Sequence, residues 1–183
     1  MQSPLYDQVG MNAPEPQPSP ISLPITTSAL RAALGRFATG VAIITCRDVA
    51  GVAVGLTANS FASLSLDPPL VLWSLRKASP SVVAFGEASG FTVNVLAESQ
   101  IDLSRRFASS SITDKFAEGA WRDGERGAPH LIGAAAVFEC ESFSQQDAGD
   151  HVLYIGRVLR LEDSGLAPLV FHGGRYHLLG EIL

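Results

Sequence analysis

The first segment with a helical pattern of apolar residues spans residues 27–40. Its apolar side chains recur at the three- and four-residue spacing of one helix face, namely Leu30, Ala33, Leu34 and Phe37. Thr27 or Ser28 can supply an N-cap, and Gly40 can end the helix. The pattern therefore predicts one amphipathic helix.

After this helix the apolar pattern becomes typical of strands. Residues 41–46 and 52–57 are two β-rich runs separated by RDVAG. Residues 61–66 and 70–75 are two more, separated by Asp67-Pro68-Pro69. Short β-rich runs joined by turn residues predict two consecutive hairpins.

The remaining pattern predicts two short helices, three further strands and one irregular passage. In chain order these are a helix from Pro80 to about Gly86, a strand at 91–96, a helix from about Ser99 to Phe107, a polar surface passage from Ser109 to Ala128, and long β-rich runs at 134–146 and 151–162 around the turn DAGD. At least seven strands joined mostly by tight turns, with too few helices to alternate with them, predict a mostly β fold with flanking helices. The expected architecture is a closed antiparallel β-barrel with the helices outside it.

The N-terminal 24 residues differ from the rest of the chain. They hold six of the eleven prolines and no apolar period, which predicts a disordered, Pro-rich arm over residues 1–24. With 183 residues, 46% of them hydrophobic, the chain can bury one sizeable core but hardly two. Residues 25–183 are therefore expected to form a single domain.

Composition narrows the possible partners and the compartment. The chain has 13 basic and 18 acidic residues, a net charge of −5, and no block of Lys or Arg, so we expect no nucleic-acid partner. Apolar runs stay far below the ~18 residues needed to span a bilayer, so we expect no membrane partner. No secretory signal opens the chain, and Cys46 and Cys140 lie in strand-like apolar runs. These features predict reduced core cysteines in a cytoplasmic protein.

Several familiar catalytic motifs are absent from the sequence. It contains no GxGxxG, GxxxxGK[ST], CxxC, HExxH or GxSxG pattern. The four histidines, at positions 130, 151, 172 and 177, show no metal-ligand spacing with a carboxylate. We therefore expect no metal site.

The segment RKASPSVV is a candidate anion site. Pro80 suits the first position of a helix and Ser79 suits the cap, so free backbone N–H groups would lie beside Arg76 and Lys77. An ordinary capped helix with two solvated cations explains the same pattern, and the local sequence leaves both interpretations open.

The segment TANS, residues 57–60, interrupts the apolar runs with small polar side chains. Small side chains let backbone amides approach a flat heteroaromatic ring, and their polar atoms can pair with its carbonyls and nitrogens. A ring at 57–60 and a phosphate near Ser79 would together have the shape of a flavin nucleotide. A plain polar loop between two hairpins remains the alternative.

Several motifs in one order, from about Ser28 to Gly180, resemble the short-chain NAD(P)H:flavin reductase family. They are GRFATGVAIIT, GLTANSFASLSLDPPLVLWSL followed by KASPS, FTVNVL, FA…DKF, GDHVLYIGRV and FHGGRYHLLG. The members of this family are the reductase partners of two-component flavin monooxygenases. The resemblance implies an FMN-binding split barrel, a homodimer, and reduction of FMN or FAD by NADH or NADPH. It also implies an oxygenase component that receives the reduced flavin.

The resemblance also implies which residues form the site. Those expected to bind the flavin are Thr57, Ala58, Asn59 and Ser60 along the ring, Lys77, Ala78, Ser79 and Ser81 towards the phosphate, and Phe107 and Tyr176. His151 would lie on the nicotinamide side as the catalytic residue, with Tyr176 as a second wall. An imidazole can orient the nicotinamide or transfer a proton. A turn histidine that bonds only its own hairpin is the structural alternative.

Three functions remain open at this point. The leading hypothesis is an NAD(P)H-dependent flavin reductase, because direct hydride transfer needs two oriented rings and no acid–base triad. The rival is a non-catalytic module that binds FMN or another small ligand in the same pocket. A flavin-dependent oxidase of a small amine or vitamin is the third. The GDH motif favours the reductase over the binding module, since a reductase needs an orienting group on the open face of the ring and a binding module does not.

Overall fold

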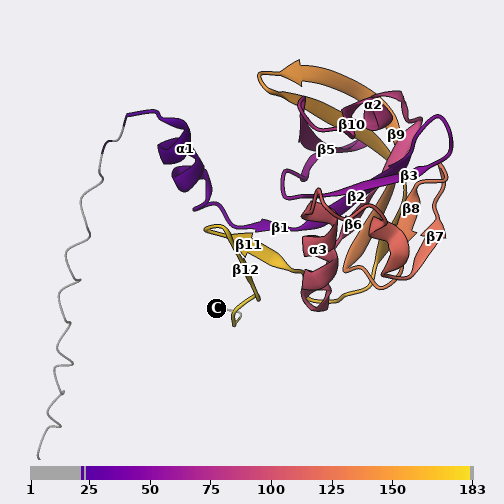
Figure 1. Cartoon of the computed structure of the whole chain (residues 1–183). Helices are drawn as coiled ribbons and strands as arrows, with labels where there is room; N and C mark the ends of the chain where they lie inside the picture. The colour runs from indigo at the N-terminus through magenta and orange to yellow at the C-terminus, as the bar shows by residue number, and fades with distance from the viewer. Residues whose placement is uncertain (1–21, 23, 182–183) are drawn as a thin grey trace, which may run out of the picture.

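The structure of the chain is a computed structural model, and it describes residues 22 and 24–181 (Figure 1). Except for residues 22 and 24, the predicted N-terminal arm lies outside the described residues. The helices are α1 (Thr27–Leu34), α2 (Val82–Glu87) and α3 (Ile101–Ala108). The strands are β1 (Thr39–Gly40), β2 (Ala42–Arg47), β3 (Ala53–Ala58), β4 (Ala62–Leu66), β5 (Pro69–Arg76), β6 (Gly90–Val95), β7 (Trp121–Asp123), β8 (Pro129–Leu131), β9 (Ala136–Ala148), β10 (His151–Asp163), β11 (Val170–His172) and β12 (Arg175–His177). The chain is mostly β with few helices, as the sequence predicts.

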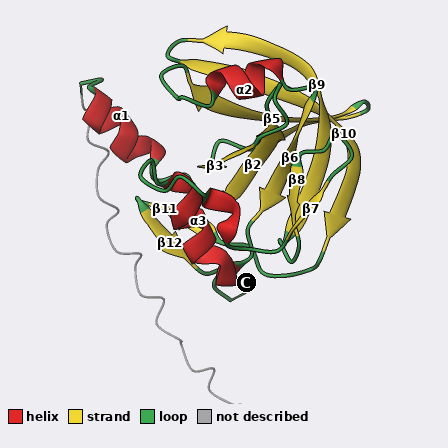
Figure 2. Ribbon diagram, turned by 45° about the vertical axis from the view of Figure 1, so that its right-hand side comes forward, coloured by secondary structure: helices red, strands yellow, loops and turns green. Residues whose placement is uncertain are grey.

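Seven strands form one antiparallel sheet in the order β3-β2-β6-β9-β10-β5-β4. The predicted hairpins β2–β3, β4–β5 and β9–β10 are all confirmed. The sheet curls strongly around its interior (Figure 2). Within residues 22 and 24–181 the two edge strands, β3 and β4, share no hydrogen-bonded ladder. The closed form of the barrel is therefore not confirmed and stays a prediction.

Two smaller sheets accompany the main one. Strands β1, β11 and β12 form a three-stranded sheet, and β7 pairs with β8. Helix α1 lies apart from the main sheet in both ribbon views (Figure 1, Figure 2). In the described part of the chain no helix combines the length and the apolar character that crossing a membrane requires.

Helix α1 differs from its prediction at both ends. Its N-cap is Thr26, whose hydroxyl oxygen accepts a hydrogen bond from the Ala29 amide at 3.1 Å. The helix ends at Leu34, one residue before Gly35, so Phe37 lies beyond it. A cap one residue earlier and a nearer glycine account for the shift. No residue of α1 is buried by the described part of the chain, so the predicted apolar face is left exposed there.

Strand β2 of the main sheet is buried on both faces. Consecutive residues of a strand point to opposite faces, and in β2 the buried neighbours Ile43 and Ile44 belong to two different apolar clusters. One cluster contains Trp73, which stacks on Tyr154 with the ring centroids 4.7 Å apart. The other contains Phe107 of α3. Burial on both faces explains why β2 is a continuous apolar run in the sequence.

Both cysteines belong to this core. Cys46 and Cys140 are buried and free, as the sequence predicts. Burial raises the pKa of each thiol to about 12, because it disfavours the charged thiolate. A thiol held in its neutral form is a poor nucleophile, so neither residue is a candidate for chemistry.

The passage from Ser109 to Ala128 is not the simple surface excursion that its polar composition predicts. Phe116 and Trp121 pack on Phe107, with ring centroids 5.0 Å and 5.4 Å away. Trp121 also begins β7. Two aromatic side chains in an otherwise polar segment are enough to hold it against the core.

A buried polar cluster fixes the β7–β8 pair to β9. Glu139 accepts a hydrogen bond from the Glu125 amide at 2.7 Å and contacts the His130 imidazole at 2.7 Å. The Arg122 guanidinium lies 3.2 Å from the same carboxylate and 2.6 Å from Glu162. A buried charge requires such partners, and Glu139 has them on both oxygens.

Candidate active site

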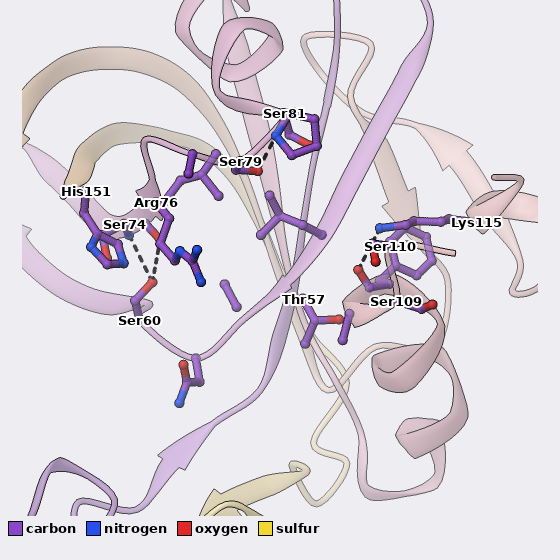
Figure 3. Close-up of a pocket in the computed structure, with 18 residues that line it drawn as sticks. Thr57, Ser60, Ser74, Arg76, Ser79, Ser81, Ser109, Ser110, Lys115 and His151 are labelled. Atoms are coloured by element: carbon purple, nitrogen blue, oxygen red, sulfur yellow. Dashed lines mark hydrogen bonds between the residues drawn. The ribbon is translucent and has the colours of Figure 1, made fainter. Parts of the chain in front are cut away.

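One cavity of about 720 Å³ opens where four segments of the fold meet (Figure 3). They are the end of β3, the end of β5 with the residues after it, the end of α3 with its following loop, and the start of β10. The lining residues are Leu56, Thr57, Ala58, Asn59, Ser60, Ser74, Leu75, Arg76, Ala78, Ser79, Pro80, Ser81, Phe107, Ala108, Ser109, Ser110, Lys115 and His151. Most of the predicted site residues therefore line one space.

The predicted ring-binding segment follows the end of β3. The Thr57 hydroxyl donates a hydrogen bond to the Ser104 carbonyl of α3 at 2.7 Å. The Ser60 hydroxyl donates to the Ser74 carbonyl and accepts from the Ser74 amide, both at 3.0 Å. Because the single O–H of each side chain is already used, these hydroxyls can offer a ligand only an acceptor. Their main effect is to fix the walls of the cavity.

The segment between β5 and α2 forms a tight turn before the helix starts. The Ser79 amide donates to the Arg76 carbonyl at 2.9 Å, and the Ser79 hydroxyl accepts from the Ser81 amide at 3.3 Å. Helix α2 begins at Val82 with Ser81 as its N-cap. The predicted start at Pro80 with a Ser79 cap is therefore wrong by two residues, because the turn comes first. Both serines still face the cavity.

His151 is the first residue of β10, opposite Arg76 of β5 in the strand register. Its Nδ1 lies 2.8 Å from the Asp150 carboxylate, and 37% of its side chain is exposed. The hydrogen bond and charge of His151 hold the pKa of Asp150 below its usual range. An Nδ1–H that donates to Asp150 leaves Nε2 available to a ligand. The side chain thus combines a fixed orientation with access to the cavity.

Phe107 closes the inner wall of the cavity, where it is 1% exposed. It lies against Gly55 of β3, where an added Cβ would sit 2.6 Å from a ring carbon of Phe107. Only glycine allows this approach, because that spacing is shorter than real Cβ contacts. Gly55 therefore lets α3 pack closely on β3 and sets the position of the wall.

Two predicted site residues are not among those that line the cavity. The Lys77 ammonium group pairs with Asp147 of β9 at 3.0 Å. The Tyr176 hydroxyl is 2.8 Å from the Ser104 hydroxyl, and its ring packs on Phe171. Lys77 therefore joins the turn after β5 to the β9–β10 hairpin. Tyr176 contacts α3 through Ser104, outside the cavity lining.

Sequence reasoning missed several lining residues. The predicted site does not include Ser74, Ser109, Ser110 or Lys115, and it includes Arg76 only as part of an anion site. Lys115 does have a signal in the sequence, because it lies in the FA…DKF motif of the family resemblance, but the motif was given no role at the site. Its neighbour Phe116 anchors the loop on Phe107.

The residues present suit a flavin nucleotide. The volume lies within the range of about 300–1,000 Å³ that small-molecule sites occupy. Phe107 and Leu56 offer an apolar wall, while Arg76, Lys115 and the serines offer donors suited to phosphate oxygens. No cluster of three or more His, Cys, Asp or Glu able to hold a metal occurs among residues 22 and 24–181.

Comparisons with known proteins identify relatives of this chain. A family model described as the flavin reductase like domain matches residues 34–180. A "Probable flavin reductase" of Rhizobium meliloti (strain 1021) is 48% identical over 148 residues, which cover 81% of this chain and 47% of that protein. The chain thus spans about half the length of this relative. "FMN reductase (NADH) SmoA" of Agrobacterium fabrum (strain C58) is 43% identical over 148 residues, covering 81% of this chain and 83% of that one.

A solved structure extends the similarity to three dimensions. The "Styrene Monooxygenase Flavin Reductase (SMOB)" of Pseudomonas putida S12 is 36% identical with a TM-score of 0.76, covering 84% of this chain and 99% of that one. The family model alone matches well over half of the chain. The chain therefore belongs to the flavin reductase-like domain family.

Proposed function

We propose that this protein is an NAD(P)H-dependent flavin reductase. It transfers hydride from NADH or NADPH to FMN or FAD and supplies free reduced flavin to a separate monooxygenase component. The observation that carries the proposal is the shared cavity, in which the 57–60 segment, the Ser79–Ser81 turn and His151 surround one space. The names of SmoA and of the styrene monooxygenase reductase support the same activity.

The residues of the chain bind and orient the two substrates. A bound flavin supplies the hydride acceptor, and the reduced nicotinamide supplies the donor. Thr57, Ala58, Asn59 and Ser60 present backbone and small side chains to the ring, with Phe107 at its inner side. Ala78, Ser79 and Ser81 lie at the phosphate end. Fixed walls favour catalysis because hydride transfer depends on the alignment of the two rings.

His151 orients the nicotinamide at the open side of the cavity. Its Nδ1 is held by Asp150, so the ring enters the cavity in one orientation with Nε2 free. Lys77 and Tyr176 act from outside the lining, in our proposal. Lys77 holds the turn and the hairpin together through Asp147, and Tyr176 holds α3 through Ser104.

One assay tests the proposed function. Purified protein is mixed with NADH, or in parallel with NADPH, and with catalytic FMN in air, and the nicotinamide absorbance is followed. We expect oxidation that depends on added flavin. Tight flavin binding with no oxidation of either nucleotide would contradict the proposal and favour the non-catalytic binding module instead.

We also propose that the protein is a homodimer. Helix α1 has no buried residue, and its Leu30 and Leu34 side chains are 50% and 64% exposed. Phe37, which follows the helix, is 77% exposed. A protruding helix with a bare apolar face gains stability when a second copy covers it. Light scattering on the purified chain measures the mass directly, and a monomeric mass would contradict this proposal.

A further inference from the structure

Lys115 lines the cavity but is not among the residues that the family resemblance implies for flavin binding. It follows α3 in the loop with Ser109 and Ser110, and all three line the cavity. In the view of Figure 3 they lie on one side of Thr57, while Arg76 and His151 lie on the other. The cavity therefore has a cationic side chain at each of two separated positions.

The loop that carries Lys115 is held in place by Arg106. The Arg106 guanidinium donates to the Lys115 carbonyl at 3.0 Å and to the Asp114 carbonyl at 2.7 Å. It also pairs with Glu118 at 2.8 Å. These three contacts hold the backbone at Lys115, the residue before it and Glu118 after it. The position of the lysine is therefore set before any ligand arrives, which lowers the entropy cost of binding.

The two lysines of the chain differ in charge compensation. Lys77 is paired with Asp147 at 3.0 Å. Within the described residues Lys115 has no carboxylate within 4.0 Å, and its ammonium group donates to the Phe107 carbonyl at 2.9 Å. That bond uses one of three N–H donors, so two remain for a ligand. Lys115 is the lysine whose charge is available to the cavity.

Desolvation adds to this difference. Burial lowers the pKa of Lys115, because it disfavours the charged ammonium group. A partly desolvated cation without an anionic partner gains more from meeting an anion than an exposed, paired one does. The anionic part of a flavin nucleotide is its phosphate.

We propose that Lys115 binds a phosphate group of the flavin nucleotide, with Ser109 and Ser110 beside it. This inference rests on the proposed function, since it concerns the same cavity. It assigns the strongest phosphate contact to the loop after α3 and not to Lys77. Structural support of α3 is the competing role, because the Lys115 ammonium group also satisfies a carbonyl at the end of that helix.

The test compares FMN with riboflavin, which lacks only the phosphate. Lys115→Met keeps most of the apolar stem and removes the charge, and Lys77→Met is the matched control. Dissociation constants are measured by quenching of flavin fluorescence. Loss of a charge-assisted contact predicts that Lys115→Met weakens FMN binding about 10- to 100-fold. We expect riboflavin binding to change less than about threefold. Lys77→Met should weaken FMN binding less than Lys115→Met does, and Lys115→Arg should recover most of the affinity.

Other outcomes would overturn the inference in distinguishable ways. An equal loss for FMN and riboflavin in Lys115→Met would assign the residue to the ring or to the support of α3. If Lys77→Met lost more FMN affinity than Lys115→Met, with riboflavin affinity unchanged, the phosphate would bind at the turn after β5. If Lys115→Met does not fold, two other measurements test the inference. Lys115→Arg should bind FMN with most of the wild-type affinity, and added salt should weaken the binding of FMN to the wild type while leaving the binding of riboflavin unaffected. Absence of any flavin binding by the wild type would overturn both this inference and the proposed function.

Discussion

The hydroxyl of Thr57 donates a hydrogen bond to the backbone carbonyl of Ser104 at 2.7 Å. This bond joins the end of β3 to α3, the two elements that form one side of the cavity. Tyr176 extends the link, because its hydroxyl contacts the Ser104 side chain at 2.8 Å. Residues that are far apart in the sequence thereby fix the width of a single binding site.

Thr57→Val tests this link with little change in side-chain shape. The substitution removes the hydrogen bond between β3 and α3, and one such bond contributes about 0.5–1.5 kcal/mol. We expect the free energy of unfolding in urea to fall by that amount and flavin affinity to fall with it. Thr57→Ser keeps the hydroxyl and serves as the control. A Thr57→Val protein with unchanged stability and affinity would mean that the bond does not shape the cavity.

Tyr176→Phe separates a supporting role from a direct contact with substrate. The ring still packs on Phe171, but the bond to Ser104 is lost, so we expect a loss of about 1 kcal/mol in stability. The KM for NADH should stay near the wild-type value, because Tyr176 does not line the cavity. A raised KM with unchanged stability would instead place Tyr176 at the nicotinamide, as the family resemblance implies.

The sequence predicts the strands well because their signals are local. The β2–β3 and β4–β5 hairpins follow directly from apolar runs separated by turn residues, and both are confirmed. Turn chemistry and alternation act over a few residues, so a single sequence carries them. A closed barrel would need the two edge strands, β3 and β4, to pair with each other, and within residues 22 and 24–181 they do not, although they are consecutive in the sequence.

The site was harder to predict in full. The 57–60 segment was predicted because small polar residues interrupt apolar runs, Ser79 because it suits a helix cap before Pro80, and Ser81 from the family resemblance. Lys115 was missed, since its place in the cavity depends on Arg106 and on the packing of Phe116 against Phe107. Lys77 is predicted at the phosphate from the family resemblance and from its place beside a candidate helix N-terminal anion site. The pairing of Lys77 with Asp147, 70 positions away in the sequence, could not be read from local pattern.

Glu139→Gln tests the buried polar cluster through its pH dependence. Burial alone would raise the pKa of Glu139, but the Glu125 amide, His130 and Arg122 outweigh it and hold that pKa below the usual value of 4.5. A carboxyl with a lowered pKa contributes stability above its unfolded pKa and loses that contribution as pH falls through its folded pKa. The wild type should therefore lose stability as pH falls below about 4.5.

We expect Glu139→Gln to lower the free energy of unfolding at pH 7 by about 2–3 kcal/mol, because charged hydrogen bonds are lost. Its stability should also fall less steeply with acid than that of the wild type. Denaturant titrations at several pH values give both quantities. Asp102→Asn removes an exposed pair with Arg105 and should change little at any pH. Parallel pH profiles for the wild type and Glu139→Gln would show that Glu139 is not the source of the acid sensitivity.

His151→Ala tests the mechanism. The imidazole is held by Asp150 at the open side of the cavity, away from Lys115, Ser109 and Ser110 in Figure 3. We expect the KM for NADH to rise about 10-fold, which corresponds to one lost contact of about 1.4 kcal/mol. Flavin affinity should stay near the wild-type value. Some kcat should also be lost, because a poorly aligned nicotinamide transfers hydride slowly even when it is bound.

Asp150→Asn is the matched variant for His151. It keeps an oxygen that can accept the Nδ1–H bond but removes the charge, so an orienting role predicts kinetics closer to the wild type than to His151→Ala. Proton transfer by His151 would look different. The wild-type kcat would then follow an ionisation in its pH profile that His151→Ala lacks, provided that product release does not limit turnover. Unchanged NADH kinetics in a folded His151→Ala protein would reduce this side chain to a turn histidine, bonded to Asp150 and without a part in the reaction.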